Sequence, residues 1–192
     1  MSTIKDNVTE RLAQAIKHRR EQLGLTLRAL ASTSGVSSSM ISDIERGAKS
    51  PTISTLLALA QALGVTMSAL VDSATPPNGR IHVVRASERP AIIDPTSGAR
   101  RNSFGPVLAG SKVEFLRYGV APHTMAGPFA AHASGTIEHM HLAAGSIRAL
   151  FGTDAVMLET GDSCTCLADA PHCFDNREGD VEALIYIVVE RS

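Results

Sequence analysis

The chain has 192 residues, is 44% apolar and carries a formal net charge of −1 at pH 7. This length fits one large domain or two small ones. No apolar run approaches the roughly 18 residues that a membrane-spanning helix needs, and residues 1–6 contain no apolar signal core. These features exclude a helical membrane protein, and we expect the protein to be soluble and cytoplasmic.

The two parts of the chain differ in charge. Residues 1–72 hold eight basic and six acidic side chains, a net charge of +2, whereas residues 73–192 have a net charge of −3. We therefore expect the N-terminal part to face nucleic-acid phosphates. Its charge is modest, so tight binding to a duplex would need two copies. A mildly basic helical domain is also common in proteins that bind no nucleic acid.

Helical periodicity governs the first 72 residues. A first helix is predicted over 7–23, where Leu12, Ile16 and Leu23 share one apolar face. The basic residues at 17–20 fall largely on its other faces. They either form a solvated surface or touch DNA phosphates, and the sequence does not choose between the two.

Two shorter helices follow, separated by a tight break. Thr26 can cap the second helix, whose apolar positions recur at i, i+3 and i+4. Gly35 and Val36 break the chain, and Ser37 can cap a third helix that has an apolar face of its own. Two short amphipathic helices joined by a three- or four-residue turn containing Gly are what a DNA-reading helix-turn-helix needs.

Two further helices are predicted before a turn-rich segment. Ser54 can cap a fourth helix, and Thr66 can start a short fifth helix that ends near Asp72. The sequence Ser-Ala-Thr-Pro-Pro-Asn-Gly that follows is typical of a linker. The predicted organisation is a helical domain, 1–72, a linker, 73–79, and a second domain, 80–192.

Four motifs follow one another in the helical part. They are Leu-Gly-Leu-Thr-Leu-Arg-Ala-Leu-Ala at 23–31, Ser-Gly-Val-Ser at 34–37, Ile-Ser-Asp-Ile-Glu-Arg-Gly at 41–47 and Leu-Ala-Gln-Ala-Leu-Gly-Val at 59–65. With them, residues 11–71 resemble the phage-repressor-type (Cro/C1-type, XRE) helix-turn-helix family. The resemblance implies a five-helix, lambda-repressor-like domain that binds duplex DNA. The alternative is a small helical bundle that makes only protein contacts.

The helix-turn-helix predicts a set of DNA-contacting residues. The N-terminus of the second helix directs free N–H groups and a partial positive charge outward, which suits a phosphate, and in the resembled family this end lies against the DNA backbone. The hydroxyl-rich third helix can approach base edges, although serine tolerates several bases. The predicted DNA-binding residues are Thr26, Arg28, Ser37, Ser38, Ser39, Ser42, Arg46 and Lys49.

The three cations of that set, Arg28, Arg46 and Lys49, are expected to supply much of the affinity for DNA. Arg46 has a second role that is compatible with the first. It precedes Gly47 at the end of the third helix, where a cation favours the helix dipole and Gly favours a left-handed cap.

The apolar period changes from 3.6 to 2 after Arg80. Short candidate strands, punctuated by Gly, Pro and Asp, indicate an antiparallel sandwich or barrel. These strands are 81–84, 91–93, 113–118, 137–142, 146–151, 156–158 and 183–189. The predicted fold class is therefore α + β, with two domains.

Two motifs in this second half carry another resemblance. The first is His132, Glu138 and Gly145, with six residues between the last two; the second is Gly161, His172 and Asn176, with ten and then three residues between them. Through these motifs, residues 110–190 resemble the cupins, which are double-stranded β-helix barrels of jelly-roll type. A helix-turn-helix followed by a cupin is a known arrangement of regulators.

The cupin resemblance implies a metal site with one ligand missing. Metal-binding cupins hold a divalent ion with two histidines and a Glu from the first motif and a histidine from the second. His132, Glu138 and His172 match this set, but Ala130 stands in place of the other histidine. Three such ligands can hold zinc with water as the fourth, and the same donors suit other transition metals.

A pocket without metal is the alternative. The second motif has Leu167 and Asp169 where the family favours Pro and Gly, and a cupin that senses a molecule need not hold an ion. The residues expected to line an effector pocket are His132, Glu138, Met140 and His172.

His139 and His141 alternate with Glu138 on one predicted strand. If Glu138 faces inward, both histidines face the other side of the strand, which makes them second-choice ligands.

The three cysteines, Cys164, Cys166 and Cys173, are odd in number and lie in one short segment. This pattern does not indicate a disulfide framework. They are either small buried residues or thiolates that, beside an imidazole, ligate a soft metal or sense oxidants.

We expect a DNA-binding transcriptional regulator rather than an enzyme. The helical domain would bind a near-palindromic operator as a homodimer, with recognition helices one DNA turn apart. The cupin would bind a small effector and change the placement of the two helices, which requires unequal affinity for the two arrangements. The resemblance implies amino-acid, sulfur or small-metabolite control. The alternative is a metal-dependent cupin enzyme, a dioxygenase or isomerase, that carries a DNA-binding domain.

Overall fold

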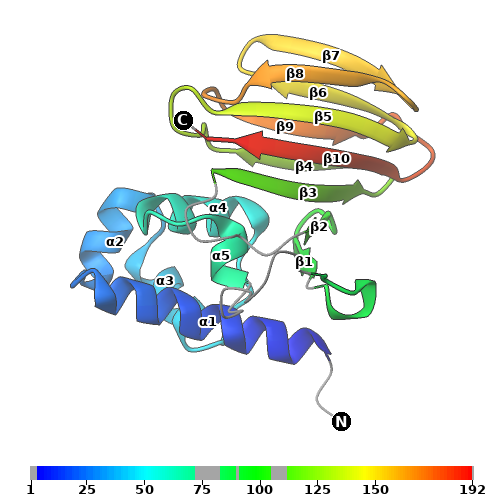
Figure 1. The fold of residues 1–192 in the computed structure, drawn as a ribbon. Coiled ribbons are helices and arrows are strands. Elements are labelled where there is room, and N and C mark those ends of the chain that lie inside the picture. Colours follow the sequence, from blue (N-terminus) through cyan, green and yellow to red (C-terminus); the bar gives the residue numbers. More distant parts are fainter. Residues whose placement is uncertain (1–3, 72–82, 90, 105–111, 192) are drawn as a thin grey trace. The chain divides into compact units, whose positions relative to one another are not determined.

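The chain forms two compact units, Met1–Thr75 and Pro76–Ser192, which we describe separately (Figure 1). The computed structural model describes residues 4–71, 83–89, 91–104 and 112–191. The predicted linker at 73–79 lies outside the described residues. Within those residues, no helix has the length and apolar character needed to cross a membrane.

The first unit consists of five helices. They are α1 (Ile4–Gln22), α2 (Leu27–Ser34), α3 (Ser38–Glu45), α4 (Ile53–Ala62) and α5 (Met67–Val71). The first helix was predicted over 7–23 and instead starts at Ile4 and ends at Gln22. Leu23 lies beyond this end and is 43% exposed, so its assignment to the apolar face was wrong. The buried core side chains are Leu12, Ile16, Leu30, Ile41, Ile44, Ile53, Leu56, Leu57, Leu59, Leu63, Met67 and Leu70.

Side-chain caps begin the short helices. Thr26 Oγ1 accepts a hydrogen bond from the Ala29 backbone N–H at 3.1 Å, and Ser37 Oγ accepts one from Met40 at 3.3 Å. Both caps were predicted and are confirmed. Each satisfies a backbone donor that the first helical turn leaves without a partner.

The fourth helix begins earlier than predicted. Its cap is Thr52, whose Oγ1 accepts from the Thr55 N–H at 3.0 Å, and Ser54 lies inside the helix. The reason is packing: Ile53, Leu56 and Ala60 are all buried on one face. Because Ile53 belongs to that face, the helix must begin before Ser54.

The end of α3 matches its predicted signal. Gly47 has a φ of +69°, its N–H donates to Ile44 O, and the Ala48 N–H donates to Asp43 O. These two bonds close the helix around a left-handed residue, a conformation that costs a side-chain-bearing residue about 1 kcal/mol or more.

The second unit is an antiparallel structure of two sheets. One sheet has the strand order β1-β2-β3-β10-β5-β8, and the other has the order β4-β9-β6-β7. The strands are β1 (Ala91–Ile93), β2 (Arg100–Ser103), β3 (Val113–Val120), β4 (Thr124–Phe129), β5 (Ile137–Ala144), β6 (Ser146–Phe151), β7 (Asp154–Glu159), β8 (Ser163–Leu167), β9 (His172–Asn176) and β10 (Ala183–Glu190). A short 3₁₀ helix, Ala86–Glu88, precedes them.

Six of the seven candidate strands are confirmed. The seventh, 81–84, is wrong at Val83 and Val84, which form no strand, while 81–82 lie outside the described residues. Four strands, β2, β4, β8 and β9, were not among the candidates. β2 and β9 are rich in polar side chains, β8 is a short run of Ser, Thr and Cys with one Leu, and Gly127-Pro128 interrupts β4.

The core of this unit lies between the sheets. Burial alternates along β10, where Ala183, Ile185, Ile187 and Val189 are buried and the residues between them are more exposed. The opposite sheet contributes Phe129, Ile147, Ala149 and Phe174. Both sheets therefore bury one face, as a strand period of two requires.

Asn176, in the second cupin-like motif, has a structural role. Its side chain is 2% exposed, and its amide donates to Val120 O at 3.0 Å, Ala121 O at 3.2 Å and Val181 O at 2.9 Å. A Cβ at Gly179 would lie 2.0 Å from Asn176 Oδ1. The small residue at 179 therefore gives the amide room to hold two loops together.

We predict that Asn176→Ala destabilises the second unit by about 3 kcal/mol, because three carbonyls lose a donor. Urea unfolding of the full chain measures the change. Arg177→Ala is the matched control, because its guanidinium pairs with Asp175 at an exposed position, and its effect should be much smaller. Equal effects of the two substitutions would contradict the structural role of Asn176.

Candidate functional sites

The third helix presents its hydroxyls outward. Ile41 and Ile44 are buried on its inner face, at 0% and 1% exposure. Ser37 and Ser39 are exposed, and Ser38 and Ser42 are half-buried. Thr26, Arg28 and Lys49 are exposed as well. The predicted DNA-binding residues are thus all exposed or half-buried on α2, α3 and the segments beside them.

Ser37 and Ser39 already have local hydrogen bonds. Ser37 Oγ accepts from the Met40 N–H and lies 3.2 Å from Ser39 Oγ. Their hydroxyls therefore have less freedom to contact a base than that of Ser38. Ser42 Oγ is also engaged, because it accepts a hydrogen bond from Arg46 at 2.7 Å.

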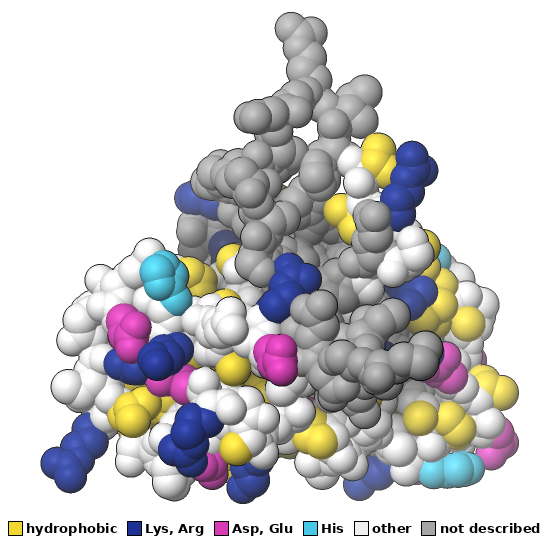
Figure 2. Space-filling view, turned by 90° about the horizontal axis from the view of Figure 1, so that it is seen from below, with side chains coloured by type: hydrophobic (Ala, Val, Ile, Leu, Met, Phe, Trp, Pro, Cys, Tyr) yellow, Lys and Arg dark blue, Asp and Glu magenta, His cyan; other side chains and the backbone are white. Residues whose placement is uncertain are grey.

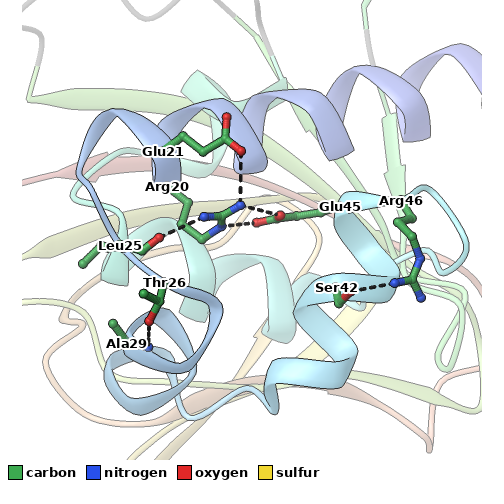
Figure 3. Close-up of polar contacts among 8 residues, drawn as sticks. All are labelled: Arg20, Glu21, Leu25, Thr26, Ala29, Ser42, Glu45 and Arg46. Carbon is green, nitrogen blue, oxygen red and sulfur yellow. Dashed lines mark hydrogen bonds and ion pairs between the residues drawn. The ribbon is translucent and has the colours of Figure 1, made fainter.

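Arg46 folds back on its own helix. Its guanidinium donates to Ser42 Oγ at 2.7 Å (Figure 3). It also donates to Asp43 Oδ1 at 2.6 Å, while its side chain is 64% exposed. An exposed ion pair of this kind contributes about 0–1 kcal/mol. Arg46 can therefore exchange Asp43 for a phosphate at little cost.

Arg20 has a role that the sequence analysis did not identify. Its Nε and Nη2 donate to the two oxygens of Glu45 at 2.7 and 2.9 Å, and its Nη1 donates to Leu25 O at 2.9 Å (Figure 3). The side chains of Arg20 and Glu45 are 12% and 8% exposed, and the hydrogen bonds to Glu45 raise the pKa of Arg20. Arg20 is thus neither solvated nor available to phosphates. For this residue, both predictions made for the basic residues at 17–20, a solvated surface and a phosphate contact, were wrong.

This bidentate pair joins three elements. Arg20 comes from α1, Leu25 precedes α2 and Glu45 ends α3. A second arginine, Arg19, donates from Nε to Leu63 O at the end of α4. The two guanidiniums therefore fix the ends of the helices around the helix-turn-helix. The sequence contained one signal for this pair: an arginine in the first helix and a glutamate in the motif Ile-Ser-Asp-Ile-Glu-Arg-Gly, which could form an ion pair.

Both basic and acidic side chains are visible among the described residues in Figure 2, where Lys and Arg side chains lie among Asp and Glu side chains. The net charge of the N-terminal part, +2 over residues 1–72, is small, so DNA affinity must depend on a few cations.

We predict that Arg20→Met destabilises the first unit by about 3 kcal/mol, because it leaves the nearly buried Glu45 carboxylate unpaired. The double variant Arg20→Met/Glu45→Gln should recover part of this loss. Arg46→Met, which breaks an exposed pair, is the control and should cost less than about 1 kcal/mol. Urea unfolding of the full chain measures all three, and equal costs for Arg20 and Arg46 would refute this ranking.

A second candidate site lies between the sheets of the β unit. Glu138 on β5, His172 at the start of β9 and His132 between β4 and β5 place one ligand atom each within 4.8 Å of one another. His132 Nε2 and His172 Nε2 lie 3.2 and 3.8 Å from Glu138 Oε1. The three side chains are at most 9% exposed, and Met140 is 2% exposed beside them on the inward face of β5.

The hydrogen bonds of this site leave ligand atoms available on His172 and Glu138, while His132 Nε2 is hydrogen-bonded to Glu138 Oε1 at 3.2 Å. His172 Nδ1 lies 3.2 Å from Ala170 O, so Nδ1 carries the proton and Nε2 keeps a lone pair. Burial lowers the pKa of His172, which keeps the ring neutral. Glu138 Oε2 is buried and accepts no hydrogen bond from a described residue. A carboxylate oxygen without a donor and a neutral imidazole held by its second nitrogen both suit a metal ligand.

Aromatic rings enclose His172. Phe151 stacks on it with centroids 5.1 Å apart and planes 9° apart, and Phe129 lies 5.4 Å away. Tyr118 packs against Phe129 and Phe174, and burial raises the pKa of Tyr118 to about 12. The tyrosine therefore stays protonated, and the rings give the site a wall of low polarity. These rings come from four strands, and no sequence motif joins them.

The fourth cupin position and the nearby histidines lie elsewhere. Ala130 is exposed and offers no ligand. His139 and His141 are exposed on the face of β5 opposite Glu138, so they cannot complete the buried set. The expectation that they face the other side of the strand is confirmed.

The three cysteines are free and half-buried. Burial raises the pKa of all three thiols, to about 12 for Cys166, whose Sγ donates to Glu138 O at 3.6 Å. Thiols with raised pKa values are protonated at neutral pH, so they are poor metal ligands and react slowly with oxidants. This favours the interpretation of the cysteines as small packing residues.

Comparisons with known proteins identify the helical part of the chain. Residues 16–70 match the helix-turn-helix family model HTH_3. The HTH-type transcriptional regulator SutR of Escherichia coli K12 is 28% identical over 172 residues, which cover 89% of this chain and 90% of SutR. The HTH-type transcriptional regulator y4dJ of Sinorhizobium fredii is 46% identical over 52 residues, which cover 27% of this chain and 68% of that protein.

Solved structures extend the similarity to the whole chain. An HTH_3-family transcriptional regulator from Vibrio cholerae superposes with a TM-score of 0.79 at 26% identity, over 97% of this chain and 98% of that one. The structure of FeII HppE matches with a TM-score of 0.51 at 22% identity, over 96% of this chain and 100% of that one, which shows a shared fold alone.

The capped helix pair and the two-sheet barrel define a two-domain transcriptional regulator with a DNA-binding helix-turn-helix and a cupin-like domain. The chain belongs to the XRE (Cro/C1-type) family of helix-turn-helix regulators, with its cupin at the C-terminal side.

Proposed function

We propose that this regulator binds a near-palindromic operator as a homodimer and that a small effector in the cupin pocket modulates the binding. The observation that carries the proposal is the accessible α2–α3 face, which the Arg20–Glu45 pair holds from behind. Because the helix-turn-helix is already ordered, its entry into the major groove loses little conformational entropy.

The DNA-contacting residues divide by chemistry. Thr26 begins α2, whose N-terminal N–H groups suit a phosphate. Arg28, Arg46 and Lys49 are exposed cations for the backbone. Ser38 and Ser42 are half-buried hydroxyls of α3 that we assign to base edges, and Ser42 would exchange its hydrogen bond with Arg46 for one with a base. Serine contacts carry modest sequence preference, so discrimination relies on few hydrogen bonds.

We predict that Ser38→Ala/Ser42→Ala narrows the ratio of specific to non-specific binding by about tenfold, which corresponds to roughly 1.4 kcal/mol. Lys49→Ala should instead weaken binding to all duplexes alike and lower the salt slope by about 1. Fluorescence anisotropy at several salt concentrations measures both, with an operator selected from random duplexes and a scrambled control. An equal loss of specific and non-specific binding in the serine variant would contradict the assignment of Ser38 and Ser42 to base readout.

The cupin pocket suits a small molecule held by polar atoms inside an apolar wall. His132, Glu138 and His172 converge on one point, and Phe129 and Phe151 flank His172. These three ligands would hold a divalent transition metal, and a metal there would supply direct coordination of an effector's oxygen or nitrogen. The buried Glu138 oxygen without a hydrogen-bond donor is the observation that fits this group.

We predict that zinc raises the melting temperature of the metal-free full chain, because an ion that binds only the folded state stabilises it by about 2.7 kcal/mol at 100 times its Kd. In a His139→Ala/His141→Ala background, which removes two exposed histidines of β5, Glu138→Gln and His172→Ala should each remove most of this increase. His123→Asn is the control, because His123 is an exposed histidine of the same unit. Differential scanning fluorimetry measures the shifts, and an unchanged shift in both pocket variants would exclude this ligand set.

A metal-dependent cupin enzyme is the second candidate. The compact His132–Glu138–His172 set favours it, while the lack of a ligand at Ala130 argues against it. Tightly bound iron or manganese together with turnover of a small molecule, both lost in His172→Ala, would support the enzyme over the sensor.

A further inference from the structure

Two histidines lie side by side on the outer face of the barrel. His139 and His141 are two residues apart on β5 and are both exposed. Residues at i and i+2 of a strand point to the same face and have Cα atoms about 7 Å apart, so one small ion can lie within reach of both rings. Neither histidine belongs to the buried set.

A hydroxyl on the neighbouring strand holds each ring. His139 Nδ1 lies 3.1 Å from Thr165 Oγ1, and His141 Nδ1 lies 3.0 Å from Ser163 Oγ. The two hydroxyl residues are the register partners of the two histidines on β8. The same contact therefore repeats twice along one strand pair.

This contact prepares the outer nitrogen of each ring. When Nδ1–H donates to the hydroxyl, Nε2 carries the lone pair and points away from β8. Metal-bound histidines are commonly fixed in this way, by a hydrogen bond from the nitrogen that does not ligate the ion.

Glu190 adds a carboxylate at the same place. It ends β10, the strand that pairs with the other edge of β5, and its Oε2 lies 3.9 Å from His139 Nε2. That distance is too long for a hydrogen bond. Its register partner on β5 is Ile137, two residues before His139 and four before His141, so Glu190 adds negative charge beside His139 and is not a ligand common to both rings.

The histidines also form part of a hollow of ≈ 680 Å³. Its other side chains include Phe115, Tyr186 and Val188, which give it an apolar rim. We propose that His139 and His141 form a second metal site, for a divalent ion of the zinc, copper or nickel class, with open coordination positions facing this hollow. Imidazole donors suit these ions.

The test uses the full chain, stripped of metal, and zinc or copper(II) as the probe. Native mass spectrometry should find the outer ion retained in His172→Ala, which removes the buried site. In that background, His139→Ala or His141→Ala should each weaken zinc binding at least tenfold, and Ser163→Ala/Thr165→Val about tenfold, as loss of ligand-orienting partners does. His18→Ala, which removes an exposed histidine of α1, should change nothing.

Copper(II) electron paramagnetic resonance in the same His172→Ala background provides a second readout. That variant should show hyperfine coupling to two imidazole nitrogens at the outer site, and the further loss of His139 or His141 should leave one fewer. Unchanged spectra and affinity in the His139→Ala/His141→Ala double variant, or an equal loss in His18→Ala, would overturn the proposal. Operator binding and the zinc response of the buried site are measured separately, so their failure is distinguishable.

Discussion

Strict alternation of side chains along β5 governs the chemistry of the barrel. Glu138, Met140 and Leu142 are buried on one face, whereas His139 and His141 are exposed on the other. Pairing with β8 on one side and β10 on the other fixes this register. A slip of one residue would exchange the two faces and place both outer histidines in the core. The ionisable side chains of this one strand are therefore divided between the protein interior, where Glu138 is buried, and the solvent-exposed surface, where His139 and His141 lie.

In the helical domain, the corresponding constraint is electrostatic. Each of the short helices α2 and α3 has eight residues, too few to be stable alone in water. Their caps satisfy the first turns, and the Arg20 guanidinium bonds to the segment before α2 and to the last residue of α3. The angle between the two helices is thus held by polar bonds at their ends as well as by the apolar core.

Much of this architecture could be predicted from the sequence, because caps, left-handed glycines and apolar periods are local signals. Thr26, Ser37 and Gly47 behave as their local sequence requires. The Arg20–Glu45 pair could not be assigned, because both residues also fit a solvated surface and only the packed fold brings them together. The start of α4 was wrong because both Thr52 and Ser54 can cap, and the burial of Ile53 decides between them.

The buried site shows the same division. The spacing of the two cupin-like motifs predicted that His132, Glu138 and His172 lie close together. The fold places their ligand atoms within 4.8 Å of one another. The aromatic wall around His172 could not be predicted. Phe129, Phe151 and Phe174 lie on three different strands, and the sequence does not show which strands are neighbours. Strand pairing is non-local, so residues that share a pocket need share no motif.

The ion pair between Arg46 and Asp43 has a consequence for how this protein attracts DNA. Arg46 approaches a duplex with the Asp43 carboxylate beside it, so the pair together carries almost no net charge. When a DNA phosphate takes the place of Asp43 on the guanidinium, the carboxylate remains nearby and repels that phosphate. The contribution of Arg46 to long-range attraction is therefore small, and its effect is confined to the final docked position, where the direction of its N–H groups matters. Arg46 would thus act on the lifetime of the complex more than on the rate of encounter.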